Sequence, residues 1–445
     1  MKNKVAIVGA GLVGTLWAVY MAKRGFKVHL YDRRPDIRKL KIVQGKSINL
    51  ALSDRGWRGL EGAGIADEIK KVAIPMSGRL MHGLDGSVTY QPYGKEDQAI
   101  YSVSRGVLNQ TLLQCADNYE NVETFFNLRC TNIDFDTNTL QFLDDATGNS
   151  HSETYDRIFG TDGAFSAVRT RMTYLDRFNY SQTYLDHGYK ELEIPANPDG
   201  THKLRKDCLH IWPRGEFMMI ALPNLDGSFT CTLFIAFEGE NSLENLKSKE
   251  QVIAFFNKNF PDVVGIMPEL TDDFFANPNA SLVMTKCYPW NYQDKICLLG
   301  DAAHAIVPFY GQGMNAGFED CTILNQLIEE NNEDFARVFP EFTKRRKPAG
   351  DAILELALRN YIEMRDKTAD PDFLLQKKIE ARFAARHPEK WIPLYSQVTF
   401  SHIPYQDALV NGDRQQAIMD KIMARPDIEQ VWDSDDVENA ILGLL

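Results

Sequence analysis

The chain has 445 residues, of which 44% are hydrophobic and 25% charged, and its formal net charge is -12. This length favours two or three folding units, because domains typically hold about 100 to 150 residues. The acidic balance argues against a general nucleic-acid or anionic-membrane surface, since such partners are bound by basic patches. No run of about 18 apolar residues occurs, so we expect no membrane span.

Cysteine and histidine usage argues against a metal centre or a disulfide framework. The 7 cysteines form no CxxC pair and the 9 histidines show no HExxH-like spacing. An odd number of scattered cysteines is typical of reduced thiols in a cytoplasmic protein. The N-terminus enters a strand-like run without the features of a signal peptide. We therefore expect a cytoplasmic protein without a metal site.

Residues 4–32 predict a strand, a glycine turn, a helix and a second strand. Gly9, Gly11 and Gly14 have the GxGxxG spacing, and Asp32 ends the second strand. In a dinucleotide-binding βαβ unit these glycines allow a tight turn, pyrophosphate approach and close helix packing, while the acid binds ribose hydroxyls. A glycine turn that binds nothing is the alternative. The motif alone does not separate FAD from NAD.

Strands and helices alternate in the middle of the chain. We expect short strands at 76–93 around a DG turn, a helix at 104–118, and strands at 123–135 and 139–143. β-Branched and aromatic residues predict an antiparallel sheet over 184–240.

The last third of the chain begins with a buried strand and is otherwise helical in pattern. The continuous apolar run KICLLGD at 295–301 is typical of a parallel sheet. From residue 315 onward we expect helices that are broken at Pro348, Pro371 and Pro393. Because parallel-sheet segments lie on both sides of the antiparallel block, the sequence predicts a discontinuous nucleotide-binding domain.

Two later segments identify a family by resemblance. FGTDGAFSAVR at 159–169 and LLGDAAHAIVPFYGQGMNAGFEDC at 298–321 resemble the DG and GD motifs of the flavoprotein aromatic hydroxylases, which share the p-hydroxybenzoate hydroxylase fold. Asp162-Gly163 is also an ordinary turn signal, and Asp301 could be a helix cap. The order of all three motifs along the chain favours the family.

Further runs resemble the kynurenine 3-monooxygenase family within that class. They extend from the first strand to about residue 405 and comprise GKSINLALSDRG (45–56), SVSRGVLNQTLL (102–113), LHIWPRGEFMMIALPN (209–224), FTCTLF (229–234), PFYGQGMNAGFEDC (308–321), RNYIEMR (359–365) and IPLYSQVTFS (392–401).

The resemblance implies an α/β fold in which a Rossmann-type FAD-binding domain is interleaved with an antiparallel-sheet substrate domain, followed by a C-terminal helical region. We expect these parts at 1–75, 98–180 and 285–335 for FAD binding, 76–97 and 181–284 for the substrate domain, and 336–445 for the helical region, which would contribute to the substrate pocket.

The resemblance also implies an activity. It is the NADPH- and O2-dependent hydroxylation of L-kynurenine to 3-hydroxy-L-kynurenine through a flavin C4a-hydroperoxide, in tryptophan degradation and pyridine nucleotide biosynthesis. The cofactor would carry out the chemistry, so no side chain is needed as acid or base. The partners would be L-kynurenine, NADPH and O2, without nucleic acid or membrane. Animal members continue into a hydrophobic anchor, whereas residues 406–445 are charged, so we expect a soluble protein.

Cofactor contacts are implied for Gly9, Gly11, Val13, Gly14, Tyr31, Asp32, Arg33, Arg34, Ala51, Arg105, Cys130, Asp162, Asp301, Met314 and Asn315. An exposed arginine at a helix start is the alternative for Arg105, and a buried core thiol is an equal alternative for Cys130. The helix beginning near Met314 would direct its positive end at the flavin ring.

Substrate contacts are implied for Arg79, Tyr93, Asn360 and Tyr395, which would bind the amino-acid end of kynurenine. A guanidinium pairs bidentately with a carboxylate, and phenol and amide groups complete the hydrogen bonds. Taken alone, each residue has an ordinary structural alternative. An apolar wall for the ring is expected from Ile220, Leu222, Phe234, Phe309 and Met364. Core packing is the alternative for all of these except Phe309.

Three other functions stay open on the sequence. The first is a hydroxylase of the same fold that acts on another aromatic acid, which would not need all four polar residues. The second is a non-catalytic FAD-fold binding protein. The third is an NAD-dependent dehydrogenase, which the segment around Gly300 does not support. For His304 we expect a packed or hydrogen-bonded structural role.

Overall fold

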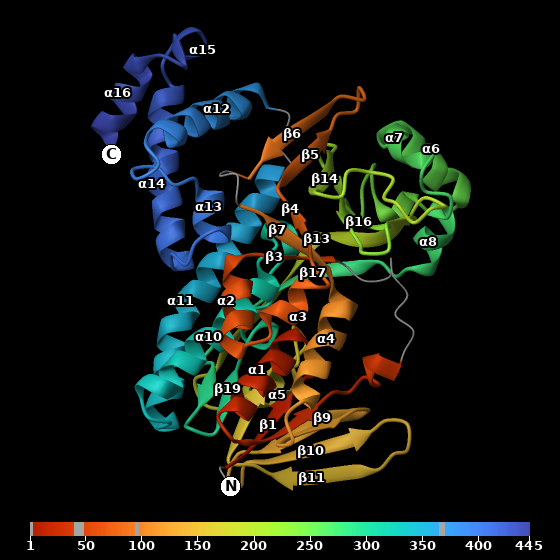
Figure 1. The fold of residues 1–445 in the computed structure, drawn as a ribbon, viewed down its shortest axis with the longest axis vertical. Coiled ribbons are helices and arrows are strands. Elements are labelled where there is room, and N and C mark those ends of the chain that lie inside the picture. Colours follow the sequence, from red (N-terminus) through yellow and green to blue (C-terminus); the bar gives the residue numbers. More distant parts are fainter. Residues whose placement is uncertain (1–2, 40–48, 94–97, 365–369) are drawn as a thin grey trace.

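The computed structural model describes residues 3–39, 49–93, 98–364 and 370–445. Within the runs quoted above, residues 45–48 and Arg365 lie outside the described residues. Figure 1 shows a lower part that contains the N-terminus, an upper part built around a large sheet, and a group of helices that ends at the C-terminus.

The lower part is built on a mainly parallel six-stranded sheet. Its first three elements are β1 (Lys4–Val8), α1 (Leu12–Lys23) and β2 (Lys27–Tyr31), so the predicted βαβ unit is confirmed. The sheet order is β18-β19-β12-β1-β2-β8, in which only β18 is antiparallel to its neighbour. The remaining strands are β8 (Val122–Phe125), β12 (Arg157–Gly160), β18 (Asn291–Tyr292) and β19 (Ile296–Leu298).

Two small sheets and several helices complete this part. One sheet joins β3 (Asn49–Leu52), β7 (Ile100–Ser104) and β4 (Ile74–Met76), and the other joins β9 (Leu128–Asp134), β10 (Thr139–Asp144) and β11 (Ser150–Thr154). The helices are η1 (Ile37–Lys39), α2 (Asp54–Ala63), α3 (Ala66–Lys70), α4 (Arg105–Asp117), α5 (Ala167–Met172) and α9 (Asp301–His304).

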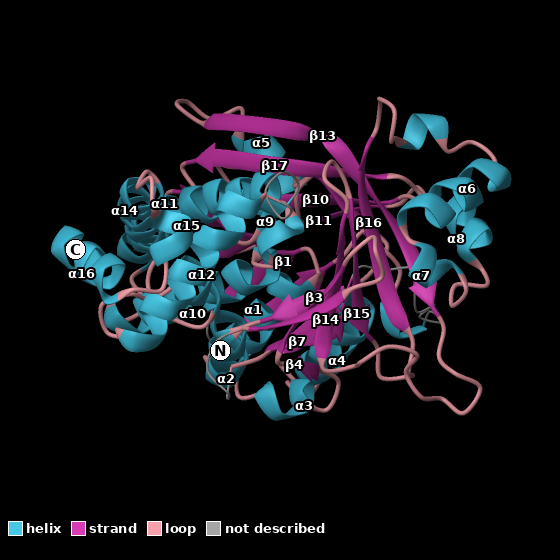
Figure 2. Ribbon diagram, turned by 90° about the horizontal axis from the view of Figure 1, so that it is seen from above, coloured by secondary structure: helices cyan, strands magenta, loops and turns pink. Residues whose placement is uncertain are grey.

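The upper part is a seven-stranded sheet in the order β17-β13-β16-β15-β14-β5-β6. Its strands are β5 (Gly78–His82), β6 (Val88–Pro92), β13 (Asn179–Ile194), β14 (Cys208–Pro213), β15 (Met218–Pro223), β16 (Phe229–Ala236) and β17 (Ala280–Tyr288). Figure 2 shows β13 and β17 running side by side from this sheet toward the six-stranded part. The seven-stranded sheet is antiparallel except between β5 and β14, which pair in parallel. Together with the mainly parallel sheet it confirms the predicted α/β fold.

The two faces of the seven-stranded sheet have different neighbours, because successive side chains of a strand point to opposite faces. Met219 and Ala221 of β15 pack in a core with the helices on the outer side. These helices are η2 (Leu243–Asn245), α6 (Lys249–Asn259), α7 (Pro261–Val264) and α8 (Leu270–Ala276). Met218 and Ile220 pack on the opposite face, with the segment around Phe309 and α11. That inner face is the one available to a ligand.

The C-terminal part is helical, as predicted. It contains η3 (Pro308–Tyr310), α10 (Gly313–Glu330), α11 (Phe335–Ile362), α12 (Pro371–Arg386), α13 (Leu394–Thr399), α14 (Tyr405–Met423), α15 (Ile428–Val431) and α16 (Asp435–Leu444). The last of these helices share a small core of their own around Phe383, Trp391 and Met419. In Figure 1 this group lies beside the seven-stranded sheet.

The expected break at Pro348 is wrong, because α11 continues through both Pro340 and Pro348. A proline removes one helical hydrogen bond and crowds the carbonyl four residues earlier. Pro348 lies on the exposed side of α11, where water can bond that carbonyl, while Phe342 and Ile353 on the other side are fully buried. Tertiary packing thus outweighs the local preference. Pro371 and Pro393 stand at helix starts, as expected.

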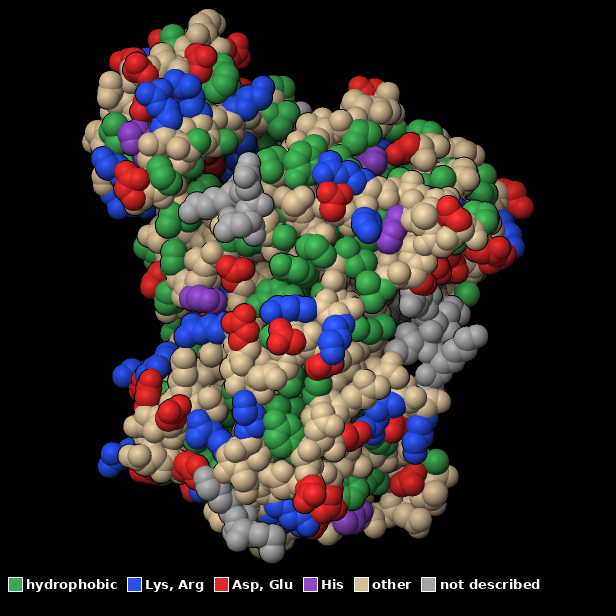
Figure 3. All heavy atoms as spheres, viewed as in Figure 1, with side chains coloured by type: hydrophobic (Ala, Val, Ile, Leu, Met, Phe, Trp, Pro, Cys, Tyr) green, Lys and Arg blue, Asp and Glu red, His purple; other side chains and the backbone are tan. Residues whose placement is uncertain are grey.

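The surface and the thiols agree with the composition. All 7 cysteines are free and buried. Figure 3 shows basic and acidic side chains interspersed over one face, without a continuous basic area. Among the described residues, no helix combines the length and apolar character that crossing a bilayer would require.

Candidate cofactor and substrate site

The three glycines of the turn after β1 have different roles: close packing requires two of them, and the third borders open space. A Cβ on Gly14 would lie 2.0 Å from the Gly9 carbonyl oxygen, and one on Gly9, where φ is +109°, would lie 2.5 Å from the carbonyl oxygen of Thr161. A Cβ on Gly11 would meet no atom within 4 Å. Gly11 caps the N-terminus of α1, so open space lies where backbone N–H groups could bind phosphates.

The acid at the end of β2 is already paired within the chain. Asp32 is buried, and its two carboxylate oxygens accept hydrogen bonds from the Arg34 backbone N–H and guanidinium at 2.8 to 3.0 Å. A ribose would therefore share or displace Arg34. Arg33 is exposed beside it, whereas the ring of Tyr31 is fully buried between Phe125 and Phe142. Only the Tyr31 backbone lies at the glycine turn, where its carbonyl accepts from Gly9 N–H at 2.7 Å.

The DG segment uses its acid to organise the turn. Oδ1 of Asp162 accepts from the Ser166 hydroxyl at 2.5 Å, and Oδ2 accepts from the Ala167 backbone N–H at 2.6 Å. Both oxygens are thus engaged at the start of α5. Cys130 is buried nearby, and burial together with the charge of Asp162 raises the pKa of its thiol to about 12. A reactive thiol is not supported there.

The GD acid has a different environment. Asp301 is partly buried at the start of α9, and among the described residues its carboxylate has no hydrogen-bond partner. Burial raises the pKa of Asp301, and the nearby positive charge of Arg105 opposes that rise. Arg105 is itself exposed at the first turn of α4. The carboxylate is therefore free to accept hydrogen bonds from hydroxyl groups of a ligand.

The start of α10 is fixed by contacts with β3 and α1. The Asn315 side chain accepts from Ser53 N–H at 2.9 Å and donates to the Ala51 and Gly311 carbonyls at 2.9 and 2.8 Å. Met314, beside it, is buried in the main core. Asn315 is consequently a residue that shapes the site through its neighbours.

Glycine also permits the close approach of α1 to the GD segment. A Cβ on Gly300 or Gly317 would come within 2.9 or 2.5 Å of the Val13 side chain. Arg169 of the DG segment donates to the Ala302 carbonyl at 2.9 Å and so ties the two motifs together. The starts of α1, α9 and α10 therefore lie together, which suits an anionic dinucleotide with a hydroxylated chain.

Three of the predicted substrate residues come together from distant parts of the chain. Arg79 lies on β5, Tyr93 directly follows β6, and Tyr395 belongs to α13. The Arg79 guanidinium carbon is 4.3 Å from the centroid of the Tyr395 ring and 5.3 Å from that of Tyr93. The two tyrosine rings stack with centroids 5.6 Å apart, and Tyr310 also stacks with Tyr395 at 5.6 Å.

Two polar atoms of this cluster are buried without a partner in the described part of the chain. They are Nε of Arg79 and the hydroxyl oxygen of Tyr93. A buried polar group that makes no hydrogen bond costs about 1–3 kcal/mol. The cluster therefore favours a ligand that brings acceptors, and a carboxylate matches the guanidinium.

The fourth predicted polar residue supports the pocket from α11. Asn360 donates to the Phe309 carbonyl at 2.7 Å and to the sulfur of Met364 at 3.4 Å. Asn360 and Met364, which are four residues apart, therefore lie on one face of the helix. At least one amide proton of Asn360 holds the Phe309 segment instead of pointing at a ligand.

The apolar residues expected to hold a ring pack in two clusters that adjoin the polar one. Phe309 lies 4.9 Å from Phe234 and 4.4 Å from Tyr361, measured between ring centroids. Leu222 packs with Tyr93 in a small cluster, and Ile220 contacts both that cluster and the larger one around Phe309. Ile220 and Tyr395 therefore connect the polar cluster with the apolar wall.

Sequence reasoning missed residues whose partners are distant. Arg169 lies inside the quoted DG run, but its acceptor on Ala302 is 133 positions away. Thr161 donates its hydroxyl to the Gly9 carbonyl at 2.9 Å, although the two are 152 positions apart. Tyr310 follows Phe309 in the motif, which was the available signal for its place in the tyrosine stack.

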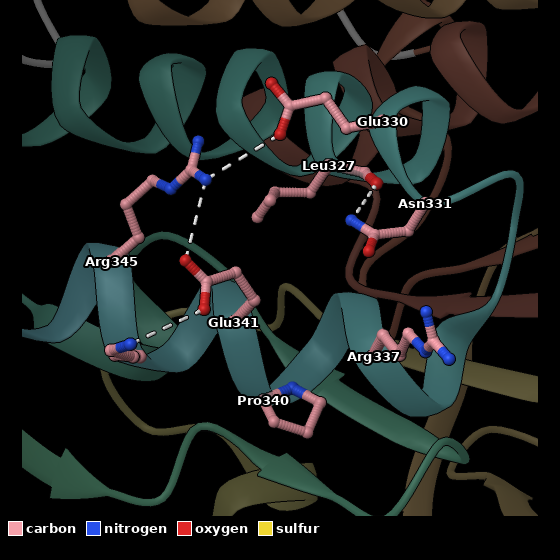
Figure 4. Close-up of a pocket in the computed structure, with 8 residues that line it drawn as sticks. Leu327, Glu330, Asn331, Arg337, Pro340, Glu341 and Arg345 are labelled. Atoms are coloured by element: carbon pink, nitrogen blue, oxygen red, sulfur yellow. Dashed lines mark hydrogen bonds and ion pairs between the residues drawn. The ribbon is translucent and has the colours of Figure 1, made fainter.

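A groove elsewhere on the surface is unrelated to this site. It has a volume of about 620 Å³ and lies between the end of α10 and the first half of α11. Figure 4 shows Arg345 of this groove directed at Glu330 and Glu341, at 3.7 and 3.5 Å. The opposite end of α10 is roughly 20 Å away, since a helix rises about 1.5 Å per residue. Lys344 and Arg345 of the groove pair with its glutamates, and its Arg337 pairs with Asp334.

Comparison with known proteins gives consistent relatives over nearly the whole chain. Residues 2–357 match the FAD binding domain family. The kynurenine 3-monooxygenase of Flavobacterium johnsoniae is 54% identical over 99% of this chain and 98% of its own length. That of Dictyostelium discoideum is 44% identical over 95% of this chain and 94% of its own length.

Solved structures share the fold at low identity. A tetrameric form of 2-methyl-3-hydroxypyridine-5-carboxylic acid oxygenase has a TM-score of 0.68 at 19% identity, covering 88% of this chain and 98% of that one. A tetracycline destructase, Tet(51), has a TM-score of 0.59 at 20% identity, covering 86% of this chain and 97% of that one.

Proposed function

The chain belongs to the kynurenine 3-monooxygenase family of FAD-dependent monooxygenases, and we propose that it hydroxylates L-kynurenine to 3-hydroxy-L-kynurenine. The balanced reaction consumes kynurenine, NADPH, a proton and O2, and yields the hydroxylated amino acid, NADP+ and water. One oxygen atom enters the ring carbon ortho to the aromatic amino group, and the other leaves as water.

The observation that carries the substrate assignment is the polar cluster of Arg79, Tyr93 and Tyr395. A guanidinium flanked by two stacked phenols, with Nε and a tyrosine hydroxyl buried and unpaired in the described chain, suits a carboxylate. The apolar wall around Phe309 adjoins this cluster and suits an aromatic ring. An amino acid with an aromatic side chain satisfies both parts at once.

The cofactor residues suit FAD. We propose that the backbone at Gly11 and the start of α1 hold the pyrophosphate, that Asp301 accepts from the ribityl hydroxyls, and that the start of α10 faces the flavin ring. Ala51, Arg105 and Asn315 would border the same space. When bound, FAD supplies the redox chemistry, passing electrons from NADPH to oxygen.

The protein's own contribution is to orient the substrate and exclude water. No side chain is needed as general acid or base. His304 is only 2% exposed, and its Nε2 lies 2.6 Å from Asp320 Oδ2. A buried histidine that is hydrogen-bonded to Asp320 at the end of α9 suits a structural role, which we propose for it.

The domain boundaries and cellular context are part of the same proposal. We assign 1–75, 98–180 and 285–335 to FAD binding, 76–97 and 181–284 to the substrate domain, and 336–445 to the helical region. We also propose a cytoplasmic enzyme whose partners are small molecules.

The decisive experiment mixes FAD-loaded protein with NADPH, O2 and L-kynurenine, and measures NADPH loss and 3-hydroxykynurenine together. We expect the product in a ratio close to one per NADPH. NADPH loss without product would sink the assignment, because a ligand that is not hydroxylated can still trigger peroxide release. Anthranilate and a phenolic acid serve as comparison substrates. Turnover of one of them alone would favour a hydroxylase of another aromatic acid, and a protein without bound flavin would favour a non-catalytic role.

A further inference from the structure

Residues 51–55 connect the flavin side of the site with the substrate side. Ala51 and Ser53 bond the Asn315 side chain at the start of α10. Two residues later, Arg55 points to the C-terminal helices. Its side chain is fully buried, although arginine is among the residues least often found in that state.

Arg55 binds the backbone of the segment that carries Tyr395. Its Nε donates to the Val398 carbonyl at 3.0 Å, and its guanidinium also donates to the carbonyls of Gln397 and Ile403. Gln397 and Val398 belong to α13, as does Tyr395. A single side chain thus bonds two carbonyls in the last turn of this short helix and one in the segment that follows it.

The charge of Arg55 is balanced on α10. Nη1 donates to Glu319 Oε1 at 2.5 Å, and the other oxygen of Glu319 accepts from Arg346 at 2.6 Å. Arg346 also donates to Asp320, whose second oxygen accepts from Gly300 N–H at 2.9 Å in the GD turn. A continuous buried network therefore runs from α13 to the proposed flavin site.

Tyr405 makes a second connection on the same side. Its ring lies 4.0 Å below the Arg55 guanidinium carbon. Its hydroxyl donates to the side chain of Gln312 at 2.9 Å, and Gln312 caps the start of α10. Both links join the C-terminal helices to the end of α10 that faces the proposed flavin ring.

We propose that Arg55 and Tyr405 are positioning residues for the reaction: they hold α13, and with it Tyr395, in register with the flavin end of α10. This inference rests on the proposed function. The amino-acid end of the substrate is bound beside Tyr395, while the reacting ring carbon must lie at the flavin. A shift of α13 therefore moves Tyr395, and the bound substrate with it, relative to the cofactor, although neither Arg55 nor Tyr405 itself contacts a ligand. Misplacement by about 1 Å is enough to reduce a reaction rate strongly.

The test compares Arg55→Met and Tyr405→Phe with wild type, using Arg58→Met as the matched control. Arg58 lies one turn further along α2 and, among the described residues, has no hydrogen bond to α13. FAD content, hydrogen exchange of the peptide spanning 394–405, KM for kynurenine and product formed per NADPH are measured on FAD-loaded protein.

We expect both variants to keep their FAD while the amides of residues 397–405 exchange at least about tenfold faster, because opening of this segment no longer breaks the side-chain bonds. KM for kynurenine should rise about tenfold in Arg55→Met, and product per NADPH should fall to less than about half. Arg55→Lys should recover only part of the coupling, since an ammonium cannot donate in the same fixed fork. Arg58→Met should match wild type.

Two results would overturn the proposal. One is exchange, KM and coupling at wild-type values in both variants. The other is an equal loss of FAD and kynurenine binding in Tyr405→Phe, which keeps the ring beneath Arg55 and would then show a general loss of structure. If wild type itself forms no 3-hydroxykynurenine, the proposed function fails, and the exchange rates alone decide whether Arg55 and Tyr405 hold α13.

Discussion

Arg79 gives the sharpest test of the substrate site. Its guanidinium lies over the Tyr395 ring, and its Nε is buried without a partner in the described chain. Arg79→Met keeps an unbranched apolar side chain of similar length and removes every donor. We therefore expect folding and FAD content to be retained while the affinity for kynurenine falls.

The size of the effect follows from the environment of the guanidinium. Removing one partner of a buried, hydrogen-bonded charge pair costs about 2–5 kcal/mol. Arg79 is only partly buried, so we expect the middle of that range, about 3 kcal/mol, which raises Kd roughly 150-fold. The change in flavin absorbance on titration with kynurenine measures Kd directly.

A second ligand identifies the group that Arg79 binds. The decarboxylated analogue of kynurenine lacks the carboxylate, so wild type should bind it roughly 150-fold more weakly than kynurenine. Arg79→Met should bind both ligands about equally, because the interaction that distinguishes them is gone. Arg205→Met is the matched control, since Arg205 also lies over a tyrosine, Tyr90, at 4.8 Å but is half exposed. If Arg79→Met weakens the binding of kynurenine and of the decarboxylated analogue by the same factor, Arg79 does not bind the carboxylate and the assignment is refuted.

Other variants test the cofactor turn, the buried ion pairs and the acid response. Gly14→Ala should prevent folding or FAD binding because its Cβ would lie 2.0 Å from a backbone oxygen. Gly11→Ala should fold but weaken FAD binding about tenfold, because its Cβ fills the open space proposed for the phosphates. Flavin absorbance measures FAD binding and thermal unfolding measures stability, so together they distinguish the two variants. Arg346→Met leaves Glu319 with one partner fewer in the core. It should lower the free energy of unfolding, measured by urea titration, by about 3–5 kcal/mol. A decrease of less than about 1 kcal/mol would contradict a contribution of the buried ion pairs to stability. Burial lowers the pKa of His29 from 6.5 to about 4. The unfolded chain therefore binds a proton at His29 at a higher pH than the folded chain does. The free energy of unfolding should fall as pH drops from about 6.5 toward 4. His29→Phe should flatten the fall of Tm between pH 7 and 5, and an unchanged slope would contradict this origin.

Local signals in the sequence were enough for the elements and for the first motif. The βαβ unit was predictable because Gly9, Gly11 and Gly14 act within a few residues of each other, and their steric roles follow from backbone geometry. The expected break at Pro348 failed for the opposite reason. A local preference of about 3 kcal/mol was outweighed by the buried face of α11, which no short window contains.

Residues whose function depends on distant partners were not predictable from pattern alone. Tyr93 and Tyr395 stack across more than half of the chain, and each alone has the pattern of an ordinary packing residue. The family resemblance named them, and the structure shows that they meet. An interaction between near neighbours was also not predicted. Arg34, two positions after Asp32, donates to the carboxylate that was expected to bind ribose.

The acids of the segment 300–321 show how a site without a catalytic base can still require buried charge. Asp301 has no hydrogen-bond partner among the described residues and is the acid proposed to bind the cofactor, whereas Glu319 and Asp320 are paired with arginines at 2.5 to 2.7 Å. The paired acids are anchored on α10: Asp320 accepts a hydrogen bond from the GD turn directly, and Glu319 is linked to α13 through Arg55. Since the cofactor supplies the oxidising chemistry, the protein must chiefly keep ring, flavin and amino-acid end in one geometry. Buried ion pairs suit that task, because displacing either partner exposes an uncompensated charge to the core.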